Sequence, residues 1–325
     1  MRAGRVVIVS SDADRAGPST PRVVCLGDLL LDVLITGGDH DGASLSIAPG
    51  GSAANTAAWL VAAGVPTALV GAVGDDMVGD LLALDLRRCG VQPALRICSG
   101  TASGTFAAQL AGGTYQPLAT CRGANDLAEW GAEEAALLRR VQHLHVSGYV
   151  FAHPVSQACA EAAAGDARRL GKTVSLDLGA PHTLRALAPE ALAATLRALA
   201  PDILFCNEEE ANTLLALQNV GGAADASALL RWAPLAVLKQ GARGSSMAGR
   251  RWADGPVVYP APRGPVADAV GAGDAFVAGF LAAWLAEAPA GDTANQALAL
   301  LAQATQSAAT CLGNVGGRPA RRAAP

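Results

Sequence analysis

Apolar residues along the chain follow two alternating patterns, which predict strands and helices. Short strand-like segments occupy 143–146, 173–178, 203–206 and 235–238, and the last two are continuous apolar runs. Before and between them, apolar residues recur every three or four positions over 132–140, 155–170, 189–199, 208–217 and 224–232. Continuous runs are typical of strands buried on both faces, whereas the wider spacing indicates amphipathic helices. The alternation predicts an α/β protein with a mostly parallel sheet between helices.

The amino-terminal third continues this pattern and then departs from it. Strands predicted at 22–28 and 69–73 alternate with helices that end at Gly64 and Gly90. The segment 105–118 instead has the pattern of a β-hairpin with a glycine turn and no flanking helices. We expect this hairpin to lie off the main sheet as a flap.

One short stretch contains the strongest candidate chemistry. Its residues are Asp268-Ala269-Val270-Gly271-Ala272-Gly273-Asp274. Helical spacing over 276–285 predicts a helix directly after it. The glycines let the backbone approach a ligand, and the free N–H groups at a helix start attract anions such as phosphate. Asp274 beside such a site has the chemistry of a general base that deprotonates a hydroxyl as it attacks phosphorus. A glycine-rich loop with Asp as the N-cap is the structural alternative.

Polar residues gather at the predicted carboxyl ends of the parallel strands, where ligands bind in such sheets. They are Asp177, Asn207, Glu210, Lys239 and Asp268. The acidic segment 207–210 suits Mg²⁺ held through water, although acidic residues also favour a helix N-terminus without any ligand. The segment 239–244 suits a backbone turn against a flat ligand or phosphate, or simply a hairpin turn.

A second group of candidates lies near the amino terminus. Asp32 interrupts the apolar run 29–35, and burying it is costly unless it has a partner or faces a cleft. Gly50 and Gly51 then open an Ala-rich helix, with Asn55 one turn inside it. Adjacent glycines allow a ligand to lie against the backbone, although a tight turn is the commoner reason for the pair.

Composition and charge exclude several classes of protein. With 24 Lys and Arg against 28 Asp and Glu, the net charge is −4 and no basic stripe is present, so we expect no nucleic-acid partner. No apolar run approaches the roughly 18 residues of a membrane helix. Residues 1–21 lack a signal-peptide core, which predicts a flexible tail on a cytoplasmic protein, and residues 317–325 are predicted to form a second tail.

Cysteine and histidine positions indicate structural roles. The seven Cys are scattered without a C-x-x-C pair, and the five His show no metal-ligand spacing. The glycine fingerprint of a dinucleotide-binding oxidoreductase is absent near the amino terminus, which argues against a dehydrogenase.

Five motifs occur in a recognisable order, and together they resemble the PfkB/ribokinase family of carbohydrate and nucleoside kinases over residues 22–316. They are the Gly-Gly…Asn box near residue 50, Gly-Asp-Asp-x-x-Gly at 74–79, Asn-x-x-Glu at 207–210, Gly-Ala-Arg-Gly at 241–244 and Asp-x-x-Gly-Ala-Gly-Asp at 268–274. The resemblance implies a ribokinase-like three-layer α/β/α sandwich with a mostly parallel central sheet. It also implies a small β lid over the sugar, formed by segments at about 32–48 and 100–120.

The resemblance also implies residue roles. Asp274 falls on the family's catalytic base, and Gly271, Ala272 and Gly273 fall on its anion hole. The implied substrate-binding positions are Asp32, Gly50, Gly51, Asn55, Phe106, Arg122 and Asn125. The implied nucleotide-binding positions are Asn207, Lys239, Gly241, Gly244 and Gln303. Glu210 matches a position that holds Mg²⁺ through water, and Asp268 matches one that binds a monovalent cation such as K⁺ in some members.

Three departures from the family pattern bear on the substrate. Ribokinase-like sequences carry Asn where Leu30 stands and Lys where Ser52 stands, so two polar sugar contacts are missing and ribose is disfavoured. Ala269 replaces the usual Thr of the last motif, which weakens the case for activation by a cation.

The activity implied is Mg²⁺- and ATP-dependent transfer of the γ-phosphoryl group to a hydroxymethyl group of a sugar. A nucleoside kinase of the same family is the nearest alternative, and a catalytically idle sugar- or nucleotide-binding regulator on this fold is the next. An exposed lid face could also pair between subunits, which leaves a homodimer through the lid open.

Overall fold

The computed structural model describes residues 6–7, 20–37, 43–111, 114–252, 255–262, 264–286 and 294–320. For 6–7, 43, 110–111, 114–115 and 294 it describes the backbone alone.

A ten-stranded sheet forms the centre of the described chain, in the order β1-β6-β5-β2-β9-β10-β11-β12-β13-β14. The strands are β1 (Val6–Val7), β2 (Val23–Leu26), β5 (Thr67–Gly74), β6 (Gln92–Cys98), β9 (His143–Ser147), β10 (Thr173–Asp177), β11 (Ile203–Asn207), β12 (Leu235–Lys239), β13 (Ser245–Gly249) and β14 (Val257–Tyr259). All pairings from β6 through β12 are parallel, while β1, β13 and β14 pair antiparallel at the two edges. The predicted mostly parallel sheet is confirmed.

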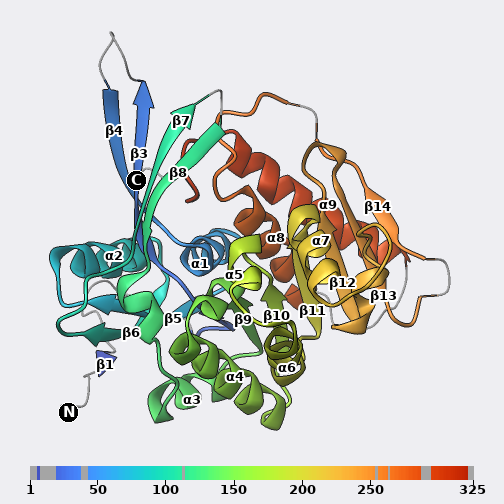
Figure 1. The fold of residues 1–325 in the computed structure, drawn as a ribbon, viewed down its shortest axis with the longest axis horizontal. Helices are drawn as coiled ribbons and strands as arrows, with labels where there is room; N and C mark the ends of the chain where they lie inside the picture. Colours follow the sequence, from blue (N-terminus) through green and yellow to red (C-terminus); the bar gives the residue numbers. More distant parts are fainter. Residues whose placement is uncertain are drawn as a thin grey trace.

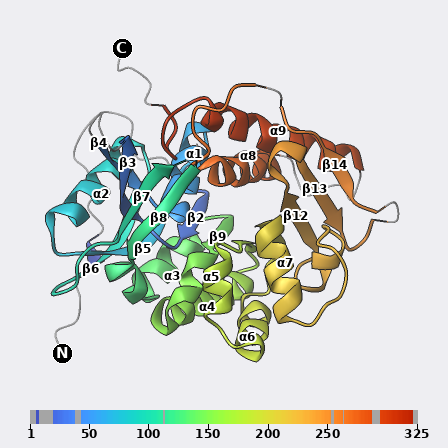
Figure 2. The same ribbon diagram turned by 45° about the horizontal axis from the view of Figure 1, so that its top comes forward.

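Helices cover both faces of this sheet, because successive strand residues point to opposite sides. In β2, Val24 and Leu26 belong to one hydrophobic core and Val23 and Cys25 to the other. One face carries α1 (Ser52–Ala62), α2 (Met77–Arg88), α8 (Ala272–Ala286) and α9 (Ala294–Leu312). The opposite face carries α3 (Ala132–Arg139), α4 (Pro154–Arg169), α5 (Pro181–Arg185), α6 (Pro189–Leu199) and α7 (Glu208–Leu217). Figure 2 shows the two helix layers with the sheet between them.

A separate four-stranded sheet, which we call the lid, stands out from the main sheet (Figure 1). Its strands are β4 (Ala43–Gly50), β3 (Leu30–Gly37), β7 (Thr105–Ala111) and β8 (Thr114–Cys121), in that order. The hairpin predicted at 105–118 is β7–β8, and it pairs in parallel with β3. The expected lid, built from two separate segments of sequence, is therefore confirmed. Gly112 and Gly113 of its turn lie outside the described residues.

Some local predictions are wrong. The helix expected over 224–232 is only a short 3-10 helix, Ala228–Arg231. Asp225 Oδ1 accepts the N–H of Ala228 at 2.8 Å, and Pro234 disfavours helical backbone in the residue before it. The predicted amino-terminal tail contributes β1, whose Val6 pairs with Arg96 of β6.

The tail predicted at 317–325 includes two residues that the structure shows to be folded. Gly317 is buried, and its carbonyl oxygen accepts the Trp59 Nε1–H at 2.9 Å. The Arg318 guanidinium lies 3.4 Å from the Asp85 carboxylate. These two residues therefore belong to the folded domain.

The start of α2 is tied to the chain that leads into the lid. Asp76 Oδ1 accepts the N–H of Gly79 at 2.8 Å and the hydroxyl of Ser103 at 2.7 Å. Asp76 Oδ2 accepts the N–H of Ser103 at 2.8 Å. Asp76 is thus both the N-cap of α2 and the link to the segment before β7.

We expect Asp76→Ala to lower the free energy of unfolding by about 1–2 kcal/mol, because a helix cap and its hydrogen bonds are lost. The matched control is Asp75→Ala, because Asp75 is the exposed neighbour. Denaturant unfolding of both variants measures the difference. Equal midpoints for the two variants would contradict the role given to Asp76.

Candidate active site

The N-terminal turns of α1 and α8 meet at the carboxylate of Asp274. Asp274 Oδ1 accepts the Ser52 hydroxyl at 2.8 Å, and Oδ2 accepts the Asn55 Nδ2–H at 2.8 Å. Ser52 and Asn55 lie in the first turns of α1, whereas Asp274 lies in the first turn of α8. Two helix starts, 222 positions apart for Ser52 and Asp274, are therefore joined through one side chain.

The strand that precedes the lid determines where α1 begins. Asp28, just after β2, accepts the backbone N–H of Ser52 at 3.0 Å and that of Ala53 at 3.4 Å. Gly51 has φ +97°, and a Cβ there would lie 2.6 Å from the carbonyl oxygen of Asp28. Glycine is required at this position because a side chain would be both strained and in collision. This close approach places Ser52 and Asn55 against Asp274.

The loop before α8 is held by the chain that follows α9. Asp268 Oδ1 accepts the Val270 N–H and Oδ2 accepts the Gly316 N–H, both at 2.9 Å. Gly271 has φ +76°, and a Cβ there would collide with the backbone of Gly317. The carboxylate of Asp268 therefore joins the two loops. Its predicted role in binding a monovalent cation stays a prediction.

Burial raises the pKa of Asp274 to about 7. The hydrogen bonds from Asn55 and Ser52 lower the pKa, the Asp177 carboxylate raises it, and the Lys239 ammonium lowers it. A carboxylate with a pKa near neutral is well suited to accept a proton from a substrate and to release it again.

A buried charged cluster lies beside this carboxylate at the carboxyl ends of β10, β11 and β12. Lys239 Nζ contacts Asp177 Oδ1 at 2.9 Å and Oδ2 at 2.7 Å. Burial favours a lower pKa for Lys239, but the Asp177 and Glu210 carboxylates outweigh it and the pKa is raised. A Cβ on Gly273 would lie 3.5 Å from Lys239 Nζ, so the ammonium borders the predicted anion hole.

Glu210 and Asn207 form a reciprocal cap at the start of α7. The Asn207 N–H donates to Glu210 Oε2 at 2.9 Å, and the Glu210 N–H donates to Asn207 Oδ1 at 2.9 Å. Burial raises the pKa of Glu210, and the Lys239 ammonium partly offsets this. The alternative of an acidic helix start is therefore realised in the structure, with the carboxylate beside the anion hole.

Mg²⁺ needs only one or two carboxylates when substrate phosphates and water complete its shell. Among the described residues, no group of three or more His, Cys, Asp or Glu could hold a metal. Glu210 is a buried carboxylate beside Lys239, so the residues present fit a magnesium ion held mainly through water and phosphate.

The acceptor side of the site is formed by the base of the lid. Asp32 pairs across strands with Phe106, so both side chains are on the same face of the lid. Burial raises the pKa of Asp32 to about 6, Arg318 lowers it, and Asp28 raises it. A Cβ on Gly50 would collide with the Asp32 carboxylate, so glycine lets this carboxylate lie over the backbone.

Asn55 has a buried oxygen that no described residue satisfies. Its Nδ2–H is donated to Asp274, while its Oδ1 has no hydrogen-bond partner in the described part of the chain. Buried polar atoms are normally paired, so this oxygen is a natural acceptor for a substrate hydroxyl.

Two predicted substrate contacts are already engaged within the protein. Asn125 donates to the carbonyl oxygens of Leu29 and Arg122 and accepts the N–H of Leu29 at 3.0 Å. Its amide therefore has a structural role, and its contact with a substrate stays a prediction. Arg122 Nε donates to Asp126 at 2.6 Å, with 17% of the Arg122 side chain exposed.

The remaining predicted nucleotide positions lie in the turn after β12 and on α9. Gly241 and Gly244 bound the 3-10 turn Gly241–Arg243 between β12 and the antiparallel β13, so the hairpin alternative is the local structure. Gln303 is exposed on α9. Their contact with a nucleotide stays a prediction.

Sequence reasoning missed the part that several residues play at this site. At position 52 the sequence indicates only the loss of a sugar contact that Lys makes in ribokinase-like sequences. In the structure the Ser52 hydroxyl donates a hydrogen bond to Asp274. Asp28 caps α1, and Arg318 influences the pKa of Asp32. The position of Asp28 directly after a buried strand was the available signal.

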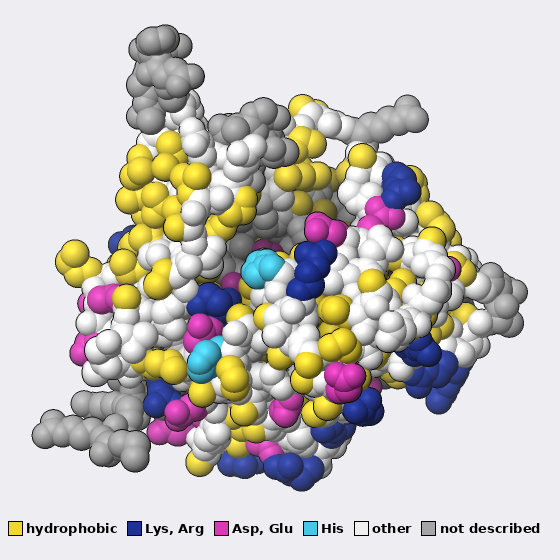
Figure 3. Space-filling view, viewed as in Figure 1, with side chains coloured by type: hydrophobic (Ala, Val, Ile, Leu, Met, Phe, Trp, Pro, Cys, Tyr) yellow, Lys and Arg dark blue, Asp and Glu magenta, His cyan; other side chains and the backbone are white. Residues whose placement is uncertain are grey.

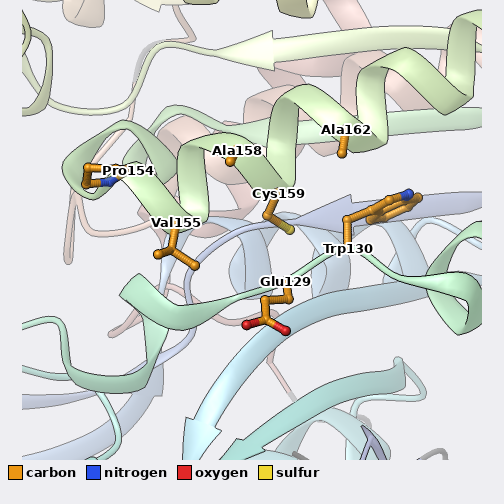
Figure 4. A pocket seen from close by; sticks show the side chains of 7 residues that line it. All are labelled: Glu129, Trp130, Pro154, Val155, Ala158, Cys159 and Ala162. Atoms are coloured by element: carbon orange, nitrogen blue, oxygen red, sulfur yellow. The ribbon is translucent and has the colours of Figure 1, made fainter. Parts of the chain in front are cut away.

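Figure 3 shows the surface hollowed between the lid and α7. A different cavity of about 450 Å³ lies between α4 and the loop at Glu129 and Trp130 (Figure 4). Its lining is largely apolar and shares no residue with the cluster around Asp274.

No helix in the described ranges is long and apolar enough to cross a membrane.

A family model for pfkB family carbohydrate kinases matches residues 20–316. The chain belongs to this family. It is accordingly a phosphotransferase that acts on an alcohol group.

Named relatives agree with this assignment. An ATP-dependent ribose-1-phosphate kinase of Halopiger xanaduensis is 31% identical over 280 residues, covering 85% of this chain and 83% of the relative. A fructokinase of Rhizobium leguminosarum bv. trifolii is 28% identical over 278 residues, covering 80% and 78%. The crystal structure of adenosine kinase from Sinorhizobium meliloti matches with a TM-score of 0.78 and 23% identity, covering 93% and 96%, which shows a shared fold.

Asp268→Ala should destabilise the kinase by about 1–3 kcal/mol, because the backbone N–H groups of Val270 and Gly316 lose their acceptor. The matched control is Asp225→Ala, since Asp225 is exposed and accepts one backbone N–H. Chemical denaturation followed by circular dichroism compares the two variants. A loss for Asp268→Ala no larger than for the control would show that the joint between the loops carries no stability.

Proposed function

We propose that this kinase transfers the γ-phosphoryl group of ATP to a hydroxymethyl group of a sugar. The observation that supports this best is the Asp274 carboxylate, held by Ser52 and Asn55 beside the N-terminal turn of α8. It combines a base of suitable pKa with an anion-binding helix start.

The acceptor alcohol lies between the lid and α1. Asp32 and the free Oδ1 of Asn55 accept hydrogen bonds from its other hydroxyl groups, which orients the reacting oxygen toward the γ-phosphorus. Asp274 takes the proton of the reacting hydroxyl as the new O–P bond forms. The bond from the γ-phosphorus to the β–γ bridging oxygen breaks, and ADP carries away that electron pair.

Electrostatic stabilisation is the larger contribution to phosphoryl transfer. The N–H groups of Gly271, Ala272 and Gly273 face the charge on the transferring group, and Lys239 adds a cation beside Gly273. Glu210 would hold Mg²⁺ through water, and the ion would supply further charge neutralisation to the phosphates. The positions of Asn207, Gly241, Gly244 and Gln303 are consistent with a nucleotide on the β11–β13 side of the site.

Asp274→Asn should reduce kcat by at least about 1,000-fold while leaving ATP and sugar affinity close to normal, because the amide cannot accept the proton. The control is Asp75→Asn, a change of the same kind at an exposed site. Steady-state kinetics and calorimetric binding separate the two effects. A kcat within a few-fold of the parent protein would refute the assigned base.

The pH dependence follows from the pKa of Asp274. Because only the carboxylate can accept a proton, kcat/KM should fall as pH drops through about 7, where Asp274 becomes protonated. Ser52→Ala removes a hydrogen bond that stabilises the charged form, so the pKa should rise. The acid limb should then move upward by about 0.5–1 pH unit.

Ser156→Ala is the matched control for this experiment, since it removes a buried hydroxyl that contacts only the backbone oxygens of Val150 and His153. The two profiles should be compared with that of the parent kinase. Superimposable acid limbs for Ser52→Ala and the parent would contradict the link between this hydroxyl and the base.

A screen of sugars and nucleosides with ATP and Mg²⁺ tests the choice of acceptor. Phosphorylation of sugars in preference to nucleosides supports the proposal. A strong preference for nucleosides would identify the nucleoside-kinase alternative. If no acceptor supports ATP turnover, the result would favour a regulator.

A further inference from the structure

Arg318 is a cation placed against the acceptor pocket by the segment that follows α9. Gly317, the residue before it, packs against the pocket itself, since a Cβ there would lie 2.7 Å from Asn55 Nδ2. The Arg318 side chain is 15% exposed, and its Nη2 lies 3.4 Å from Asp85 Oδ2 on α2. The guanidinium therefore lies between α2 and the base of the lid.

Two of its three nitrogen atoms have no partner. Arg318 Nε and Nη1 are buried and make no hydrogen bond to any described residue. Burying unsatisfied donors of a charged group costs several kcal/mol, so such atoms are normally paired. An ion pair with Asp85 alone leaves most of the donors on this side chain unused.

Acidic groups of the site interact electrostatically with the guanidinium. The groups that act on it are Asp85, Cys89, Asp274 and Asp32. Arg318 is in turn the positive charge that lowers the pKa of Asp32. Burial nevertheless lowers the pKa of Arg318 from its ordinary value, so these acidic groups do not fully offset the cost of burying the charged guanidinium.

We propose that Arg318 binds an anionic group, a phosphate or a carboxylate, carried by the acceptor sugar at a carbon other than the one that is phosphorylated. This inference rests on the proposed function. An arginine fork binds two oxygens of one phosphate or carboxylate at once, and a neutral hydroxyl offers only a single acceptor oxygen. Such an anion accepts hydrogen bonds from both nitrogens that lack a partner among the described residues.

The test uses the full-length kinase with ATP and Mg²⁺ and three acceptors: a pentose, its 1-phosphate, and an aldonic acid of similar size. We expect kcat/KM for one anionic acceptor to exceed that for the neutral pentose by at least about 100-fold. The comparison of phosphate with carboxylate identifies which anion is bound.

Variants of Arg318 then locate the recognition. Arg318→Met should raise KM for the preferred anionic acceptor by about 100-fold and leave its kcat within about three-fold. The neutral pentose should change far less, and only through the loss of the charge that lowers the pKa of Asp32. Arg318→Lys should recover part of the loss, because it restores the charge without the fork. The control is Arg168→Met, since Arg168 binds two carbonyl oxygens, those of Ala198 and Leu199, at the end of α6.

The outcomes separate the two proposals. Equal use of neutral and anionic acceptors, or a preference that survives in Arg318→Met, would overturn the role of Arg318 and leave the sugar-kinase activity standing. If Arg122→Met loses the preference for anionic acceptors while Arg318→Met keeps it, the role of Arg318 would also be overturned. Transfer to none of the sugars would overturn both. If Arg318→Met does not fold, the preference of the parent kinase and the Arg318→Lys variant still decide.

Discussion

The competition between burial and hydrogen bonding at Asp274 governs the whole site. Burial favours the protonated acid, whereas the Ser52 hydroxyl and the Asn55 amide favour the carboxylate. Their balance leaves the group able to exchange a proton near neutral pH. The fold supplies both sides of this balance. The core packs α8 closely from Ala275 onward, directly after Asp274, and Asp28 positions the start of α1 so that its polar side chains reach across.

The segment after α9 both supports the loop before α8 and places a cation beside the acceptor pocket. Gly316 binds Asp268, Gly317 packs between Gly271 and Asn55, and Arg318 follows immediately. The same few residues thus support the anion loop and place a cation beside the acceptor pocket. A change of substrate class at position 318 would leave the two hydrogen bonds to the Asp274 carboxylate in place, because Ser52 and Asn55 make them.

Much of this arrangement could be predicted from sequence, because it follows from local periodicity. Strands that alternate with helices share a parallel sheet, so the residues at their carboxyl ends meet at one edge, as Asp177 and Lys239 do at 2.7 Å. The lid could be predicted because β7 and β8 lack flanking helices. The Ser52 hydroxyl bond to Asp274 could not, since it joins distant helix starts and depends on a Gly51 backbone geometry that periodicity does not reveal. Arg318 was missed because glycine- and proline-rich sequence resembles a tail, and only Trp59 and Asp85 show otherwise.

The central claim concerns the protonation of one carboxyl group, and it can be measured without any substrate. Titration of ¹³C-labelled aspartate side chains by NMR, with Asp274→Asn used to assign the resonance, gives the pKa of Asp274 directly. The account predicts a midpoint near 7, well above that of an exposed aspartate at about 3.9. A midpoint close to the exposed value would contradict it, because burial would then not control the group that is meant to accept the proton.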